Sequence, residues 1–182
     1  LINQIQIAFR NLTWLLTGLG FNNGQFINTR ENLQILVSYF YGDINVGEWK
    51  NLEALNFEGA YLRYANFSST ILCGINFHRA VLEVANFIGA DLKGAHFEEA
   101  HLKGTLFLRA GLEGAHFEGA HLEGAHLQHA HLVRAQFTKS DLNGADLQGA
   151  YLEETDFERA DLESSNFKFA HLERANLQLA YI

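Results

Sequence analysis

A leucine or phenylalanine occupies every fifth position from 52 to 177, and Ile182 takes the next place in the same register. Between positions 62 and 180, the residue two places before this large residue is alanine, serine or threonine, with Ile75 as the exception. An α-helix repeats every 3.6 residues and a β-strand every 2.0, so neither explains a period of five. A short fixed period is typical of a solenoid, whose units bury their apolar faces by stacking on their neighbours.

Five residues per side, with a turn at each corner, allow the chain to wind as a polygonal coil. We expect the large and the small residue of each unit to point inward, with coils stacked at the strand spacing of about 4.8 Å. Glycine recurs two places after the large residue, as at Gly119 and Gly124, where a type II turn needs a positive φ. A different turn geometry is predicted at the bulkier corners Glu99, Arg109, Phe169 and Arg174.

The clearest units read AHFEG at 115–119, AHLEG at 120–124 and ADLQG at 145–149. This pattern resembles the A(D/N)LXX motif of the pentapeptide-repeat family, and the resemblance covers residues 51–182. It implies an all-β solenoid, a right-handed quadrilateral parallel β-helix with four units in each coil. Because leucine and phenylalanine alternate at the central position, we expect two opposite faces to be lined by leucine and the other two mainly by phenylalanine.

Residues 1–50 do not follow the period. Apolar residues at helical spacing predict one amphipathic helix over about 3–18, and a second begins near Asn28 and ends at Gly42. We therefore expect two domains, a short α-helical N-terminal cap over 1–50 and the repeat β-helix over 51–182.

Several classes of function are disfavoured by what the sequence contains. Its single cysteine excludes an intramolecular disulfide, and no phosphate-binding loop, dinucleotide fingerprint or nucleophile elbow is present. We therefore predict a protein that is not an enzyme, with no catalytic or cofactor-binding residues. No apolar run is long enough for a membrane span. The family resemblance implies a bacterial protein, and we predict a cytoplasmic location. Because the chain has no methionine, it looks like an excerpt, and the predicted location takes no account of segments outside it.

Histidine is concentrated at one outward position of the unit. Seven of the nine histidines occupy it: His96, His101, His116, His121, His126, His131 and His171. On a coil of four units, His96 stacks on His116, with Glu98 and Glu118 on the same face. Two imidazoles and two carboxylates could bind Zn²⁺. However, the family commonly places Asp or Asn at this position, so we interpret these histidines as outward polar residues and predict no metal site.

The net charge of −8 is carried by the repeats, since residues 1–50 hold equal numbers of acidic and basic side chains. A candidate acidic patch lies near the C-terminal end: Glu153, Glu154, Asp156, Glu158, Asp161 and Glu163. A negative rod disfavours direct binding to nucleic acid. The family resemblance offers an alternative, an acidic rod that mimics DNA, binds DNA gyrase or another DNA-binding protein, and forms a homodimer through one end.

A candidate protein-contact patch is formed by Ile88, Leu106 and Leu108, apolar residues at outward positions that are mostly polar elsewhere. The N-terminal helices or a separate protein could cover it, or it could be unused surface. Since a rigid rod presents flat faces and no predicted cleft, we favour a non-catalytic structural scaffold that binds an unidentified protein partner.

Overall fold

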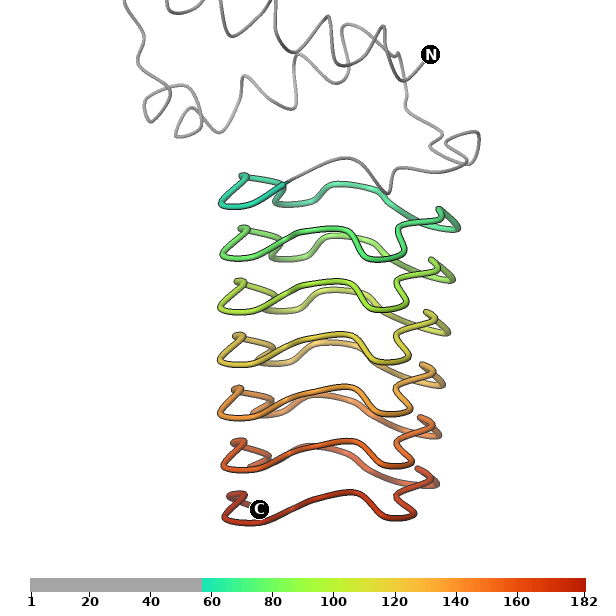
Figure 1. Cartoon of the computed structure of the whole chain (residues 1–182), viewed down its shortest axis with the longest axis vertical. Helices are drawn as coiled ribbons and strands as arrows, with labels where there is room; N and C mark the ends of the chain where they lie inside the picture. The colour runs from blue at the N-terminus through green and yellow to red at the C-terminus, as the bar shows by residue number, and fades with distance from the viewer. Residues whose placement is uncertain (1–56) are drawn as a thin grey trace, which may run out of the picture. The chain divides into compact units, whose positions relative to one another are not determined.

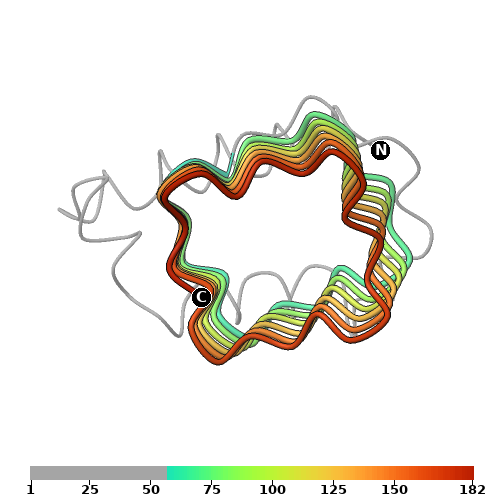
Figure 2. The ribbon, with the colours of Figure 1, turned by 90° about the horizontal axis from the view of Figure 1, so that it is seen from below.

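The computed structural model describes residues 57–182, and in this range the chain winds as a stack of four-sided coils (Figure 1). Viewed along its axis, the stack is a closed quadrilateral whose successive coils lie almost in register (Figure 2). The predicted helical cap over 1–50 and the first units of the repeat lie outside the described residues.

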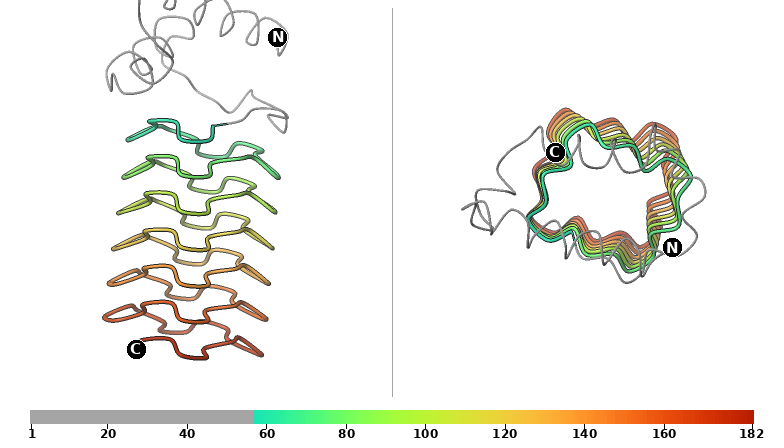
Figure 3. Two further views of the ribbon diagram at one scale, coloured as in Figure 1. Left: turned by 60° about the vertical axis from the view of Figure 1, so that its left-hand side comes forward. Right: turned by 90° about the horizontal axis from the view of Figure 1, so that it is seen from above.

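Neighbouring coils are joined by single-residue parallel bridges between residues twenty positions apart, from Tyr61↔Val81 to Asp161↔Tyr181. A turn follows each bridge, so within residues 57–182 the bridges do not extend into a longer β-strand, and no helix is present. The result is a regular ladder that is visible from the side (Figure 3). The spacing confirms four five-residue units per coil.

We number the four faces 1 to 4 in the order in which the chain passes through them, and each face is defined by the large residues at its centre. Face 1 has Phe57, Phe77, Phe97, Phe117, Phe137, Phe157 and Leu177. Face 2 has Leu62, Leu82, Leu102, Leu122, Leu142, Leu162 and Ile182. Face 3 has Phe67, Phe87, Phe107, Leu127, Leu147 and Phe167. Face 4 has Leu72, Leu92, Leu112, Leu132, Leu152 and Leu172. Leucine lines faces 2 and 4 and phenylalanine mainly faces 1 and 3, as the alternation predicts.

These central side chains fill the interior. Every one from Leu72 to Phe157 is fully buried. Along faces 1 and 3 the phenylalanine rings stack on the next coil with centroids 4.6 to 5.4 Å apart, close to the strand spacing of about 4.8 Å. Rings from the two opposite faces meet edge to face at 5.7 to 6.2 Å, an arrangement that aromatic pairs favour. The core is therefore a continuous packed column.

The corners use one backbone conformation whatever the residue. Arg109 and Glu99 have φ of 54° and 56°, comparable with 64° at Gly114, so the predicted second turn geometry is wrong; Phe169 and Arg174 show the same positive φ. Hydrogen bonds hold the corner: Arg109 N donates to Gln128 O and Ala110 N to Phe107 O, each at 3.0 Å. Left-handed backbone costs a non-glycine residue about 1–2 kcal/mol, which two hydrogen bonds of about 1 kcal/mol each offset.

Candidate functional site: the outer faces

The predicted protein-contact patch lies on face 3. Ile88 and Leu108 occupy the same outward slot on successive coils, whose backbones are joined by Gly89 N donating to Leu108 O at 2.9 Å. Leu106 lies beside them, bridged to Asn86 on one side and His126 on the other. Ile88 is exposed, whereas both leucines are half-buried. The structure therefore brings the three side chains together on one outer face.

Face 3 is also the face with the fewest charged side chains. Two outward slots flank each central residue, and on face 3 these slots hold one acidic and one basic residue within 57–182, Asp146 and Lys168. Face 1 contrasts with it: over the described coils its outward slots hold no lysine or arginine, and its acidic residues are Glu58, Glu98, Glu118, Asp156 and Glu158. The apolar patch thus lies on a nearly neutral, polar surface.

The six residues of the candidate acidic patch are spread around one coil. Glu153 and Glu154 follow the centre of face 4, Asp156 and Glu158 lie on face 1, and Asp161 and Glu163 lie on face 2. They form a belt over three faces because consecutive units turn the corners of the quadrilateral.

Arginines neutralise part of this belt. Arg134 Nε lies 2.8 Å from Glu154 Oε2, and Arg174 forms a second ion pair with the same carboxylate. Arg159 Nε lies 3.7 Å from Glu158 Oε1. The hydrogen bond from Arg134 is the main reason that the pKa of Glu154 is lowered, and both arginines add a Coulombic contribution. Exposed pairs of this kind contribute little to stability individually.

Outward histidines form stacked columns, as the twenty-residue spacing predicts. His96 and His116 stack on face 1 with ring centroids 4.9 Å apart, and His101 and His121 stack on face 2 at 5.1 Å. A third column, on face 4, was not predicted from the sequence. There, Tyr151 lies between His131 and His171 at 4.7 and 5.0 Å. The sequence could have indicated this column, because Tyr151 occupies the same slot of the unit as the histidines.

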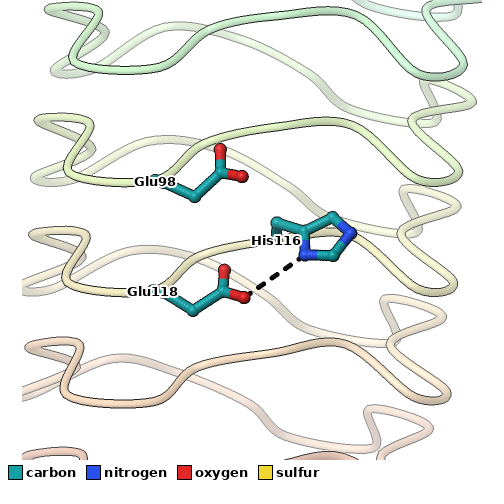
Figure 4. A group of neighbouring side chains, drawn as sticks. All are labelled: Glu98, His116 and Glu118. Carbon is teal, nitrogen blue, oxygen red and sulfur yellow. Dashed lines mark hydrogen bonds and ion pairs between the residues drawn. The ribbon is translucent and has the colours of Figure 1, made fainter.

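Within residues 57–182, metal-ligating side chains converge at three places. In each group the ligand atoms lie within 4.8 Å of one another: Glu98, His116 and Glu118; His121, Glu123 and Asp141; Glu153, His171 and Glu173. In the first group, Glu98 lies on one coil and His116 and Glu118 lie on the next, where the imidazole contacts the Glu118 carboxylate (Figure 4).

The single cysteine, Cys73, is half-buried on face 4. Burial is the main reason that the pKa of its thiol is raised, and the nearby carboxylate of Asp91 raises it further. A raised pKa disfavours the nucleophilic thiolate. We assign Cys73 no chemical role.

A closed stack of five-residue units joined by parallel bridges is a β-helix, one of the solenoid repeat architectures. The family model for pentapeptide repeats matches eight copies over residues 51–79, 72–107, 85–124, 106–144 and 140–178. The chain belongs to the pentapeptide-repeat family, whose members form a right-handed quadrilateral β-helix.

Solved structures similar to this chain include further pentapeptide-repeat proteins. HetL of the cyanobacterium Nostoc sp. strain PCC 7120, involved in heterocyst differentiation regulation, is 32% identical, with 69% of this chain and 73% of HetL covered and a TM-score of 0.28. QnrB1, a plasmid-mediated fluoroquinolone resistance protein, is 20% identical, with 70% and 72% covered and a TM-score of 0.40. Rfr23 of the cyanobacterium Cyanothece 51142 is 22% identical, with 69% and 90% covered and a TM-score of 0.34. No curated protein matches the chain. Within the described residues, no helix has the length and apolar character needed to cross a membrane.

Proposed function

We propose that the solenoid is a non-catalytic scaffold that binds a protein partner through face 3. The observation that carries this proposal is the coincidence of the apolar side chains Ile88, Leu106 and Leu108 with the least charged face of the described coils. Cores of protein interfaces are depleted of charged residues and enriched in apolar ones, whereas their rims are polar. Asn86, Gln128 and Gln148 would supply such a rim.

The packing of the repeat supports a scaffold rather than an enzyme. Fully buried leucine and phenylalanine side chains occupy the interior between Leu72 and Phe157, so binding groups are left to the outer faces. Backbone bonds between all successive coils hold those faces in a fixed relation to one another. A rigid surface binds without a large ordering cost, which favours recognition of a folded partner.

The test is a variant that places two charges in the patch, Leu106→Asp with Leu108→Asp. In a pull-down from the native host, we expect wild type to retain a partner that this variant loses. Val133→Asp is the matched control, because Val133 is an apolar outward residue of face 4 in the same slot of the unit as Leu108. Retention of the same proteins by all three forms would contradict the proposal.

Folding of the variant separates a free patch from a covered one. If face 3 is free, the double substitution should change the free energy of unfolding by no more than about 0.5 kcal/mol per site. A large destabilisation would instead mean that another part of this chain packs on the patch, as the alternative of a covering N-terminal segment requires.

A second candidate function, imitation of DNA, would use face 1. There Glu98 and Glu118, and further along Asp156 and Glu158, form an acidic column without lysine or arginine in its outward slots. Inhibition of DNA gyrase supercoiling by the wild-type chain, relieved by Glu98→Gln with Glu118→Gln, would support this role. No effect on supercoiling would remove gyrase as a partner. Homodimerisation through an end of the rod and a cytoplasmic location stay predictions of the sequence.

A further inference from the structure

We propose that face 1 carries a binding site for a divalent transition-metal ion of the Zn²⁺ type. Its ligands are His116 and Glu118 on one coil and Glu98 on the coil before. His96, whose ring stacks on that of His116 at 4.9 Å, is the proposed fourth ligand. The site is independent of the apolar patch on face 3.

The repeat itself positions these four side chains. His96 and Glu98 flank Phe97, and His116 and Glu118 flank Phe117, so one His-x-Glu unit lies directly on the next. A parallel bridge joins His96 to His116, and Phe97 N donates to His116 O at 2.7 Å. Both central phenylalanines are fully buried, and their outward neighbours are therefore held on a rigid backbone.

Within each unit the imidazole already faces its carboxylate. His96 Nδ1 lies 2.9 Å from Glu98 Oε1, and His116 Nδ1 lies 3.3 Å from Glu118 Oε1. The two rings are parallel within 4°, and each Nδ1 faces the glutamate of its own unit. In Figure 4, Glu98 lies on one coil, and His116 and Glu118 lie on the neighbouring coil. A metal ion between the coils would replace the imidazole proton in a contact that the fold has already formed.

The charges of the cluster call for a cation. Glu98 and Glu118 occupy the same slot on successive coils, and neither forms an ion pair with a lysine or arginine of residues 57–182. Their Oε2 atoms are inaccessible to solvent and have no hydrogen-bond partner. At the adjacent corner, by contrast, Glu99 does pair with an arginine, since Arg79 Nε lies 2.8 Å from Glu99 Oε2. A bound divalent ion would satisfy both buried oxygens and offset the repulsion between two like charges.

The donor atoms select the class of metal. Imidazole nitrogen with carboxylate oxygen suits Zn²⁺ and its transition-metal neighbours, which take four such ligands at about 2.0–2.2 Å. Ca²⁺ and Mg²⁺ prefer oxygen ligands alone. The ligand atoms of Glu98, His116 and Glu118 already lie within 4.8 Å of one another, so side-chain rotation without backbone movement can close the site.

The other two convergent groups lack one of these features. On face 2, Lys103 occupies the slot one coil before Glu123, whereas the corresponding slot of face 1 holds the carboxylate of Glu98. On face 4, Tyr151 occupies the slot before His171, so that site has one imidazole. Two consecutive His-x-Glu units occur on face 1 alone among the described coils.

The test is a Zn²⁺ titration of the full chain without a polyhistidine tag, after chelator treatment, followed by calorimetry. We expect one ion per chain at the tightest site, with Mg²⁺ unable to compete. Removal of a residue that only hydrogen-bonds to a metal ligand costs about 10- to 100-fold in metal affinity. Glu98→Gln with Glu118→Gln changes two direct ligands and should therefore weaken binding at least tenfold. His116→Asn should do the same.

Two matched substitutions complete the design. His126→Asn removes an imidazole from the same slot on face 3, and Asp141→Asn removes a ligand from the competing group on face 2. Both should leave the tightest site unchanged. Unaltered affinity in the face 1 variants, a loss in Asp141→Asn, equal weakening by every histidine substitution, or no binding by wild type would each overturn the proposal. All the substituted side chains point outward, and circular dichroism will verify that the variants are folded.

Discussion

The rings of Phe117 and Phe137 are the closest stacked pair in the phenylalanine column of face 1, with centroids 4.6 Å apart and planes inclined by 3°. Both side chains are fully buried. Substitution of Phe117 by alanine removes contacts with both neighbouring coils and leaves a cavity that a rigid ladder cannot close. We expect a loss of about 3–5 kcal/mol in the free energy of unfolding, measured by urea denaturation.

Phe169→Ala provides the contrast. Phe169 is a corner side chain that is 72% exposed, so its truncation should change stability by less than about 1 kcal/mol. Similar losses in the two variants would show that the column on face 1 is not the main source of cohesion.

Gly149 is the corner glycine with the least room for a side chain. A Cβ there would come within 2.6 Å of His129 Cε1 and Nδ1 on the preceding coil, and its φ is 64°. Gly144 has a similar φ of 67°, but a Cβ at that corner would meet nothing within 4 Å. Both Gly→Ala changes incur the left-handed cost of about 1–2 kcal/mol, and Gly149→Ala must also displace the imidazole. We therefore expect Gly149→Ala to lower the thermal unfolding midpoint more than Gly144→Ala does.

A double-mutant cycle isolates the collision with the ring. In a His129→Ala background, the cost of Gly149→Ala should fall to that of Gly144→Ala. If it does not, backbone strain alone limits this corner.

Most of the architecture could be predicted from spacing, because a register that holds over the whole repeat leaves one way to bury its large residues. The register decides burial even at Ile75, a large residue that is fully buried at an inner position otherwise held by small residues. The corners were less predictable. Preference for glycine at positive φ is an average over proteins, whereas at Arg109 the hydrogen bonds to neighbouring residues impose the conformation.

The outer faces were predictable in position but not in chemistry. Spacing correctly placed His96 on His116, because residues twenty apart share a slot. It could not reveal that Oε2 of Glu98 and of Glu118 is buried without a partner, since this depends on side-chain rotamers. The same spacing separates Glu153 from Glu163, since residues ten apart lie on opposite faces although they are close in sequence.

Thr105 ties one coil to the one before it through a buried hydrogen bond. Its Oγ1 donates to Leu82 O at 2.9 Å, and the side chain is fully buried. Thr105→Val keeps the shape but removes the donor, so we expect a loss of about 0.5–1.5 kcal/mol in chemical denaturation. Thr138→Val is the control because this half-buried hydroxyl lies on the outer surface, where water can replace its partner Asp156. Equal losses would contradict a special role for the buried bond.

Glu154 links the acidic belt to pH, since it accepts from Arg134 and pairs with Arg174 across three successive coils. The folded state lowers the pKa of Glu154, chiefly through the hydrogen bond to Arg134. A carboxyl group with a lowered pKa stabilises the fold fully above its unfolded pKa of about 4.3, and this contribution is lost as pH falls through the folded pKa. Arg134→Gln with Arg174→Gln should therefore be less stable than wild type at neutral pH, and the difference should vanish in acid. High salt should reduce this difference in stability as well.

Arg109→Gln, which removes an arginine without an ion pair in residues 57–182, should show no such pH dependence in thermal unfolding. A gap between wild type and the double variant that persists below the folded pKa would contradict this origin, because neither protein then carries the Glu154 charge.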